Sequence, residues 1–565
     1  MDIGKHTLKW RQLLSTESIN SHLYYDDYQS DDEKINKLFV IKNKTIFDVE
    51  LDSILQLDAL RRLENKTQVF AFKGDGKVRT RLTHSIDAMN VGYLLGTKIA
   101  DILYKKYKTE RLKLEKLDKD KNKTLINNLR SNEKAIYYLP LVLRNAALLH
   151  DIGNPPFGHR GEALITNWLE KNLDHYHINK KDLKITKSNF IDNSTLPSFG
   201  FLLQTKNNLY QDIKMFEGNA ELIRLITKLS YFINGGISIG TLSACMKYTA
   251  DINDEPNENK KYIGHHKLGH YFSEKDIVNT IRNKVGTNNR NPSAFLLEAS
   301  DDIAYRLHDI DDCIKSGHIN LNDFLHFVHK SYLEEKKDLK RIPIGKTNSY
   351  KKFLSILCDA FGVKIEKGDR IEEIYQNLKE IIKEMDSPTN TYAYEKIKTY
   401  LRLGCIDSVA KVFVDNIDSI MGDNFNESLS ELCDYSFVFN ASSKIMKQKI
   451  YNSYQVRIDE VAEYKIVNVL MENLINSVFN KRSQNDDKTI DKIYGQLEVY
   501  SSKRFLYACE QEILNKVGEF SMVEASAENL GFYVYYKLRC VIDNISGMSD
   551  DYSLSVYKKM QAVID

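Results

Sequence analysis

Residues that interrupt helices are scarce in this sequence of 565 residues, which contains 8 prolines and 26 glycines. Such a composition favours long helices joined by short connections. The seven cysteines show no CxxC spacing and no even disulfide framework, which fits a reducing cytoplasm. The formal net charge is only +2, so the composition indicates no bulk electrostatic attraction to nucleic acid.

Long hydrophobic runs are also missing. The apolar run LPLVLRNAALL is too short to span a membrane and is broken by Arg144. The amino-terminal stretch MDIGKHTLKWRQLL lacks the apolar region of a signal peptide. We therefore expect a cytoplasmic protein, and the 42% content of hydrophobic residues permits a sizeable core.

Two types of metal ligand stand side by side in LLHDIGNPPFGHRGE, where His150 and Asp151 end an apolar helical run. The turn-forming sequence GNPPFG follows at once, so the backbone leaves the helix sharply. His159 and Glu162 come next, three residues apart, and share one face of a new helix. A His-Asp pair on its own is weak evidence for a metal site, because a capped helix end with a chance neighbour gives the same dipeptide.

Two further candidate ligands lie in helical patterns elsewhere. His84 lies in VRTRLTHSIDAMNVGYLLG, an amphipathic pattern interrupted by one basic and one imidazole position. Asp301 lies in FLLEASDDIAYRLHDIDDCI, whose apolar residues keep a helical rhythm. The polar residues of this second helix form a continuous stripe of the kind that faces a cavity: Asp301, Tyr305, His308, Asp309 and Asp312.

Taken singly, each of these residues has an ordinary explanation as a satisfied core histidine or a solvated charge. The joint order His84, His150-Asp151 and Asp301, each on a predicted helix, favours a shared site instead. A metal bound through one His and one Asp needs at least two more ligands, which these imidazoles and carboxylates supply. The pattern therefore indicates a metallohydrolase.

The order and local sequences resemble the HD-domain superfamily, and specifically the deoxyguanosinetriphosphate triphosphohydrolases. The amino-terminal KWRQLLS also looks like the family's opening segment, so the resemblance covers nearly the whole chain. It implies an all-α fold, with an HD-domain helical bundle core and a helical carboxy-terminal extension. The blocks that carry it are RRLENKTQVF (61–70), VRTRLTHS (78–85), HDIGNPPFGHRGE (150–162), FEGNA (216–220), EASDDIAYRLHD (298–309) and ISGMSD (545–550).

The resemblance implies that His84, His150, Asp151 and Asp301 hold one divalent ion, manganese or magnesium. Mixed imidazole and carboxylate ligation suits such an ion and leaves positions open for water and a phosphate oxygen. Asn154 follows the HDIG sequence where some HD enzymes carry another histidine, which favours a single ion.

The catalytic pair of the family matches His159 and Glu162. Glu162 can hold the imidazole in one tautomer, and His159 can then handle a proton at the α-phosphorus. The sequence leaves two roles open, because His159 could orient the water or protonate the departing 5′ oxygen.

Substrate contacts also follow from the resemblance. Lys247, Tyr248 and Lys267 fall where the family binds the triphosphate, and Arg539 is a weaker match for the same task. Residues that in the family contact the sugar, and so select deoxyribose, match Gln68, Tyr305 and Asp309. No residue of the sequence forces guanine over the other bases.

Three regions are expected along the chain. Residues 1–50 form an amino-terminal arm, 51–330 the HD metallohydrolase core, and 331–565 a helical region that completes the nucleotide site and the assembly contacts. Within the core, 105–123 predict an exposed helix or helical hairpin, whereas 172–212 read as a loop or peripheral insert.

The leading hypothesis is a metal-dependent dNTP triphosphohydrolase that hydrolyses dGTP at the α-phosphorus to deoxyguanosine and tripolyphosphate. The resemblance also implies a homohexamer and a response to single-stranded DNA or a dNTP effector. Two alternatives stay open: another HD phosphohydrolase, such as a nucleotide phosphodiesterase or 5′-nucleotidase, and a nucleotide-sensing or nucleic-acid-binding regulatory assembly.

Overall fold

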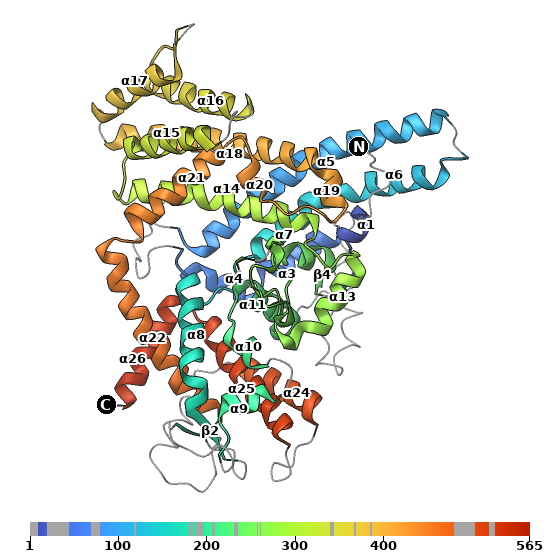
Figure 1. Ribbon diagram of the computed structural model, residues 1–565, viewed down its shortest axis with the longest axis vertical. Helices are drawn as coiled ribbons and strands as arrows, with labels where there is room; N and C mark the ends of the chain where they lie inside the picture. Colours follow the sequence, from blue (N-terminus) through green and yellow to red (C-terminus); the bar gives the residue numbers. More distant parts are fainter. Residues whose placement is uncertain are drawn as a thin grey trace.

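Helices make up nearly all the regular structure of the protein, as seen in a computed structural model (Figure 1). The few strand residues form two antiparallel pairs, β1 (Ser18–Ile19) with β4 (Ile237–Ser238) and β2 (Tyr176–Ile178) with β3 (Ile185–Lys187). The predicted all-α class is confirmed. The structure describes residues 9–19, 45–68, 79–117, 120–179, 185–187, 196–205, 209–230, 236–256, 258–259, 261–338, 344–366, 369–384, 387–479, 503–518 and 526–564.

The helices of the first part of the chain are α1 (Trp10–Leu13), α3 (Ile46–Leu55), α4 (Asp58–Arg62), α5 (Arg81–Leu117), α6 (Lys123–Ala135), α7 (Leu139–Leu149), α8 (Gly158–Asn172), α9 (Phe199–Gln204), α10 (Leu209–Lys214), α11 (Gly218–Arg224), α12 (Ile239–Cys245), α13 (Lys275–Val285) and α14 (Pro292–Lys315).

The helices of the second part are α15 (Leu321–Asp338), α16 (Ile344–Phe361), α17 (Ile371–Glu384), α18 (Ser387–Asp415), α19 (Ile417–Met421), α20 (Leu429–Leu432), α21 (Ser436–Ile445), α22 (Tyr454–Phe479), α24 (Lys503–Val517), α25 (Ala527–Ser546) and α26 (Asp550–Ile564).

Three helices, α5, α7 and α14, form the centre of the molecule and pack against one another. The α5–α7 crossing is close, because a Cβ atom at Gly96 would lie 2.8 Å from the Cα atom of Pro140. Helix α14 starts with Pro292 at its first position, and the Asn291 side chain accepts a hydrogen bond from the Ser293 amide. This packing holds the three chain segments that carry the predicted ligands.

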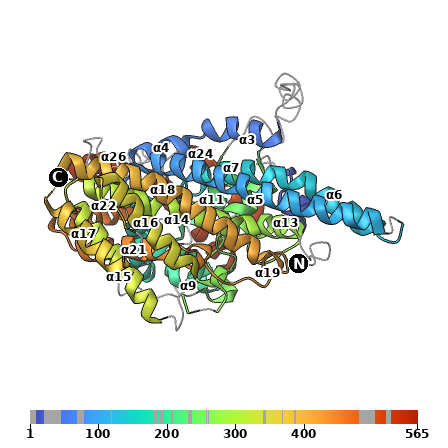
Figure 2. The same cartoon turned by 90° about the horizontal axis from the view of Figure 1, so that it is seen from above.

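The apolar core is continuous and includes buried side chains from Trp10 to Met560. The Trp10 indole donates a hydrogen bond to the Tyr107 hydroxyl over 2.8 Å, so the described part of the predicted arm packs onto α5. Helix α5 and helix α6 then project together as an antiparallel hairpin (Figures 1 and 2), joined by the Arg111–Glu133 ion pair of 2.5 Å. The predicted helical hairpin is confirmed.

For residues 172–212 the sequence left a loop or a peripheral insert open, and the expectation of a loop is wrong in part. Helices α9 and α10 and the β2–β3 pair lie in this region, of which residues 180–184, 188–195 and 206–208 are outside the described part. Ser198 caps α9 by accepting from the Phe201 amide, and Phe199 and Leu202 are fully buried. These elements are too short for their periodicity to be recognised in sequence.

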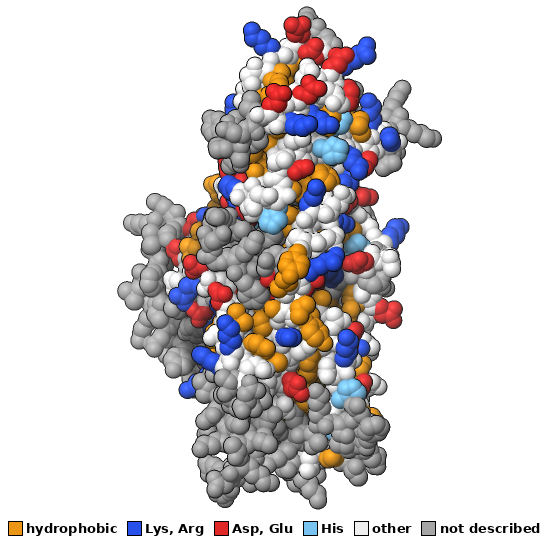
Figure 3. Space-filling model, turned by 90° about the vertical axis from the view of Figure 1, so that its left-hand side faces the viewer, with side chains coloured by type: hydrophobic (Ala, Val, Ile, Leu, Met, Phe, Trp, Pro, Cys, Tyr) orange, Lys and Arg blue, Asp and Glu red, His pale blue; other side chains and the backbone are white. Residues whose placement is uncertain are grey.

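On one side of the molecule, α22 and α26 expose apolar side chains (Figure 3). Tyr454, Ile458 and Val461 are 79%, 46% and 59% exposed and line a groove of about 580 Å³. None of the described helices has the length and apolar content needed to cross a bilayer. All seven cysteines are buried and free.

Candidate active site

The four predicted metal ligands meet where α5, the end of α7 and α14 converge. His84 lies in the first turn of α5, and its Nε2 is 2.9 Å from Oδ1 of Asp301. His150 ends α7, and its Nε2 lies 3.4 Å from the same oxygen and 3.6 Å from Oδ1 of Asp151. Ligand atoms of His84, His150 and Asp151 all lie within 4.8 Å of one another. We call these four residues the His-Asp cluster.

The donor atoms of the cluster fit a divalent ion. Nδ1 of His150 lies 2.7 Å from the carbonyl oxygen of Ala147, so this nitrogen donates and Nε2 is the nitrogen that can bind an ion once it is deprotonated. Within the described part of the chain, His150 Nε2 is buried and has no hydrogen-bond partner. A buried polar atom without a partner is costly, and a metal ion would satisfy it. Two imidazoles and two carboxylates suit manganese or magnesium better than a soft ion.

The electrostatics of the cluster favour positive charge. Burial would raise the pKa of Asp151, but Arg81 and His150 lower it to about 2. Burial would lower the pKa of His150, but the carboxylates of Asp151 and Asp301 raise it to about 9. Both carboxylates are therefore ionised at neutral pH, and a bound cation would take the place of the histidine proton.

Residues outside the cluster hold Asp151 in place. Arg81 Nη1 donates to Asp151 Oδ2 over 2.8 Å, and the Asn154 side-chain amide donates to Oδ1. The buried Lys66 ammonium in turn donates to the carbonyl oxygens of Asn154 and Ser546 over 2.5 and 2.7 Å. Sequence reasoning missed these roles, although Lys66, Arg81 and Asn154 stand inside or beside the family blocks.

The turn after Asp151 explains its unusual sequence. A Cβ atom at Gly153 would lie 2.1 Å from the carbonyl oxygen of Gly218, so no larger residue fits. Phe157 adopts the left-handed region with φ of 65°, which is strained for an aromatic residue. Its amide donates to Oδ1 of Asp550 over 3.0 Å, while Oδ2 accepts from Thr67. Asp550 thus joins the carboxy-terminal helix to the turn that precedes α8.

His159 and Glu162 form a hydrogen-bonded pair on the first turns of α8. His159 Nδ1 lies 3.0 Å from Glu162 Oε2, and Glu162 Oε1 accepts from the Gly218 amide over 3.1 Å. The hydrogen bond to Glu162 raises the pKa of His159. Burial opposes ionisation of Glu162, yet His159 and Lys267 lower its pKa. The His159 side chain is 78% exposed, so a carboxylate fixes an imidazole that remains accessible.

Lys247, Tyr248 and Lys267 also come together. The ammonium groups of Lys247 and Lys267 lie 5.7 and 5.9 Å from the centre of the Tyr248 ring. Lys247 pairs with Glu298 and Lys267 with Glu217, each over 3.2 Å. Burial would lower the pKa of either lysine, but these carboxylates raise it, so both side chains are cations.

Gln68 and Tyr305 line a smaller pocket of about 310 Å³ next to the cluster. The Tyr305 ring lies 6.2 Å from the His84 ring, and its hydroxyl is 3.4 Å from that of Tyr451. Oε1 of Gln68 and Oδ2 of Asp309 are buried without a hydrogen-bond partner in the described residues. Burial raises the pKa of Asp309 to about 8, so this carboxyl can donate as well as accept near neutral pH.

Arg539 does not join the other candidates. It is fully buried on α25, and its guanidinium donates to Asp212 over 3.1 Å and lies 3.4 Å from the Tyr271 ring centre. These contacts hold α25 against α10 and against the loop before α13. A substrate role for Arg539 stays a prediction.

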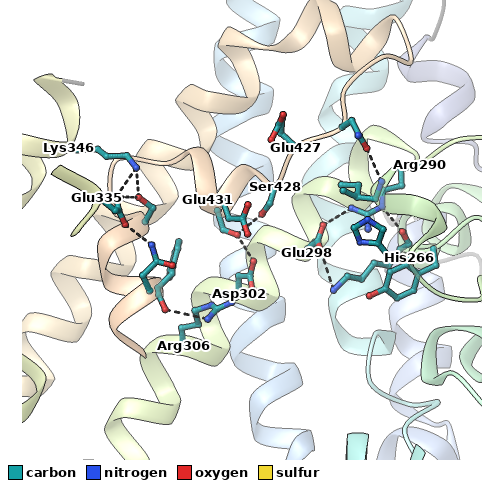
Figure 4. Close-up of a pocket in the computed structure, with 18 residues that line it drawn as sticks. His266, Arg290, Glu298, Asp302, Arg306, Glu335, Lys346, Glu427, Ser428 and Glu431 are labelled. Atoms are coloured by element: carbon teal, nitrogen blue, oxygen red, sulfur yellow. Dashed lines mark hydrogen bonds and ion pairs between the residues drawn. The ribbon is translucent and has the colours of Figure 1, made fainter. Parts of the chain in front are cut away.

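A larger cavity of about 650 Å³ lies along α14 (Figure 4). Glu298 and Asp302 of α14 line this cavity, together with Lys247 and Tyr248. Tyr305, one turn further along the helix, lines the smaller pocket. Arg306 also lines the larger cavity, so residues of α14 on both sides of Asp301 in sequence contribute to the two cavities.

No protein-family model matches the chain. A deoxyguanosinetriphosphate triphosphohydrolase-like protein of Listeria innocua is 27% identical over 524 residues, which cover 92% of this chain and 94% of that relative. Proteins named deoxyguanosinetriphosphate triphosphohydrolase from Salmonella arizonae and Klebsiella pneumoniae are each 26% identical, over 528 and 548 residues, with the same coverage. The resemblance inferred from the motifs is thus confirmed, and the chain is a relative, over nearly its whole length, of the deoxyguanosinetriphosphate triphosphohydrolase family.

Proposed function

We propose that the protein is a metal-dependent dNTP triphosphohydrolase that converts dGTP to deoxyguanosine and tripolyphosphate. The observation that carries the proposal is the His-Asp cluster, whose helix α14 also lines two unlike cavities. The larger cavity and its surroundings gather the cations Lys247 and Lys267, whereas the smaller pocket is lined by Phe157, Tyr305 and Tyr451. The names of the relatives support the same substrate class.

The two cavities give the substrate one favourable orientation. A triphosphate carries about four negative charges and is attracted to the lysines beside Tyr248. The smaller pocket suits the nucleoside, because the aromatic side chains of Phe157, Tyr305 and Tyr451 line it. The nucleoside therefore occupies the smaller pocket and the α-phosphorus lies at the cluster.

His84, His150, Asp151 and Asp301 would hold the ion. When bound, it would activate a water molecule and neutralise charge on the phosphate. Water adds to the α-phosphorus and the bond to the 5′ oxygen breaks, so the water oxygen leaves with the tripolyphosphate. His159 then moves a proton, either from the water or to the 5′ oxygen, with its ring held by Glu162.

Sugar selection falls to Gln68, Tyr305 and Asp309. Asp309 binds the 3′ hydroxyl, and the Tyr305 ring packs where a 2′ hydroxyl would otherwise lie. A hydroxyl buried without a partner costs about 1–3 kcal/mol, so a ribonucleotide would bind about tenfold to a hundredfold more weakly.

The purified protein should be incubated with each dNTP and with GTP in manganese or magnesium, and the products separated by chromatography. Deoxyguanosine plus tripolyphosphate from dGTP, with GTP spared, is the expected result. Monophosphate or diphosphate products would favour another HD phosphohydrolase. Nucleotide binding without turnover would favour the regulatory assembly.

The remaining expectations concern organisation. The division at residues 50 and 330, the homohexamer, and an effector site for single-stranded DNA or a dNTP stay predictions. Sedimentation of the full chain with and without these ligands tests the assembly and its response.

A further inference from the structure

Three cations, not two, surround the Tyr248 ring. Besides Lys247 and Lys267, the guanidinium carbon of Arg290 lies 5.9 Å from the ring centre. Among the described residues, Glu298 pairs with Lys247 and Arg290, and Glu217 pairs with Lys267. The ring thus brings together three cations whose ion-pair partners are two carboxylates, an arrangement that can bind an anion.

Arg290 is held rigidly at this position. Its Nε donates to the carbonyl oxygen of Lys247 over 2.5 Å, and its Nη1 donates to Glu298 Oε2 over 2.7 Å. Its backbone amide donates to the Tyr262 hydroxyl over 2.6 Å. Figure 4 shows Arg290 and Glu298 facing each other at the wall of the larger cavity.

Glu298 fixes two cations with one carboxylate. One oxygen accepts from Arg290 and the other lies 3.2 Å from the Lys247 ammonium. Burial alone would raise the pKa of Glu298, but Lys247 and Arg290 lower it, so the carboxylate is ionised. The spacing of the lysine and the arginine is therefore set before any ligand binds.

One nitrogen of Arg290 remains for a ligand. Within the residues that the structure describes, Nη2 makes no hydrogen bond, and the side chain lines the larger cavity. Arg290 precedes the first residue of α14, and Asp301 stands nine residues beyond Pro292, about 14 Å along the helix axis. The backbone of Arg290 thus lies before the start of α14, away from Asp301, while its guanidinium meets Lys247 at Glu298, one turn before Asp301.

We propose that Arg290 is a third phosphate-binding residue, positioned by Glu298, that binds the terminal phosphate and so selects triphosphates over diphosphates. The inference rests on the proposed function. A guanidinium suits this task because it is always charged and its fixed N–H groups match phosphate oxygens. A diphosphate bound with its α-phosphorus at the cluster ends before Arg290.

The test uses Arg290→Lys in the full chain, with Arg144→Lys as the matched control. Arg144 also pairs with a carboxylate, that of Asp48, but it lines neither of the two cavities. Calorimetry with inorganic tripolyphosphate and pyrophosphate measures binding without catalysis. We expect Arg290→Lys to weaken tripolyphosphate binding about tenfold and to leave pyrophosphate binding unchanged. The control variant should bind both anions as tightly as the wild-type protein does.

Kinetics give a second readout that a purely structural role would not move. In Arg290→Lys, KM for dGTP should rise with little change in kcat, while KM for dGDP stays the same. Equal losses for dGTP and dGDP, or for tripolyphosphate and pyrophosphate, would overturn the proposal. If the variant fails to fold, equal affinity of the wild-type protein for the two inorganic anions would overturn it as well.

The two proposals fail in different ways. A wild-type protein that binds tripolyphosphate through Arg290 but turns over no dNTP would refute the proposed reaction alone. A wild-type protein that hydrolyses dGTP while Arg290→Lys keeps full tripolyphosphate affinity would refute only the role of Arg290.

Discussion

Replacing Glu162 by Gln tests the proposed catalytic pair with a minimal change of shape. In the wild-type protein, Oε2 accepts from His159 Nδ1 over 3.0 Å and Oε1 accepts from the Gly218 amide over 3.1 Å. A carboxamide has one acceptor and one donor. If its oxygen keeps the bond to Gly218, its NH₂ group faces Nδ1, and His159 must give up the Nδ1–H tautomer.

The hydrogen bonds set the expected size of the effect. A hydrogen bond to a charged group contributes about 1.5–3 kcal/mol, which corresponds to about ten- to a hundredfold in kcat when the bond supports the transition state. The tautomer change removes the free lone pair on Nε2 and adds to this loss. Since Glu162 raises the pKa of His159, the limb of the pH profile set by His159 should move to lower pH.

The assay is deoxyguanosine release from dGTP across pH, compared with Glu170→Gln as a control. Glu170 is exposed on the same helix, so its substitution should leave kcat unchanged. A Glu162→Gln enzyme with wild-type kcat and an unshifted pH profile would refute the reasoning. A loss of activity in both variants would point to α8 as a whole instead of the pair.

Three further predictions concern the ion and the fold. His150→Ala should abolish manganese binding in calorimetry, whereas Asp302→Asn, whose side chain faces the larger cavity, should retain it. Lys66→Met should lower the free energy of unfolding in urea by about 2–4 kcal/mol, because it leaves two buried carbonyl oxygens without a donor. Arg224→Met should lower the free energy of unfolding by about 3–5 kcal/mol, because it leaves the buried carboxylates that pair with this arginine without this partner. The exposed Arg61→Met should cost almost nothing.

Much of the fold was predictable because its signals are local. The apolar rhythm around Asp301 predicts α14, and the structure contains that helix with Asn291 as its cap. Alternating charges predict the α5–α6 hairpin in the same way. The short helices α9 and α10 were not predicted, because each has fewer than two turns and is buried by residues far away in the sequence.

The candidate site was predictable only where motifs mark it. His84, His150, Asp151 and Asp301 were named from their order along predicted helices. In the structure, His84 Nε2 lies 2.9 Å from Asp301 Oδ1, and ligand atoms of His84, His150 and Asp151 lie within 4.8 Å of one another. The neighbours that fix them were not named. Lys66 and Ser546 are 480 residues apart in sequence, and no local pattern connects them.

By itself, the sequence determined the helical class, the turn after the His-Asp pair and the residue types available for a metal and a triphosphate, because periodicity, capping and turn chemistry act over a few residues. Only the tertiary structure decided which side chains share a space. In the folded protein, Arg290 and its partner Glu298 lie near the ring of Tyr248, and Arg539 donates a hydrogen bond to Asp212. Such contacts depend on how whole helices pack against one another. The residues of a single segment do not determine the register of that packing.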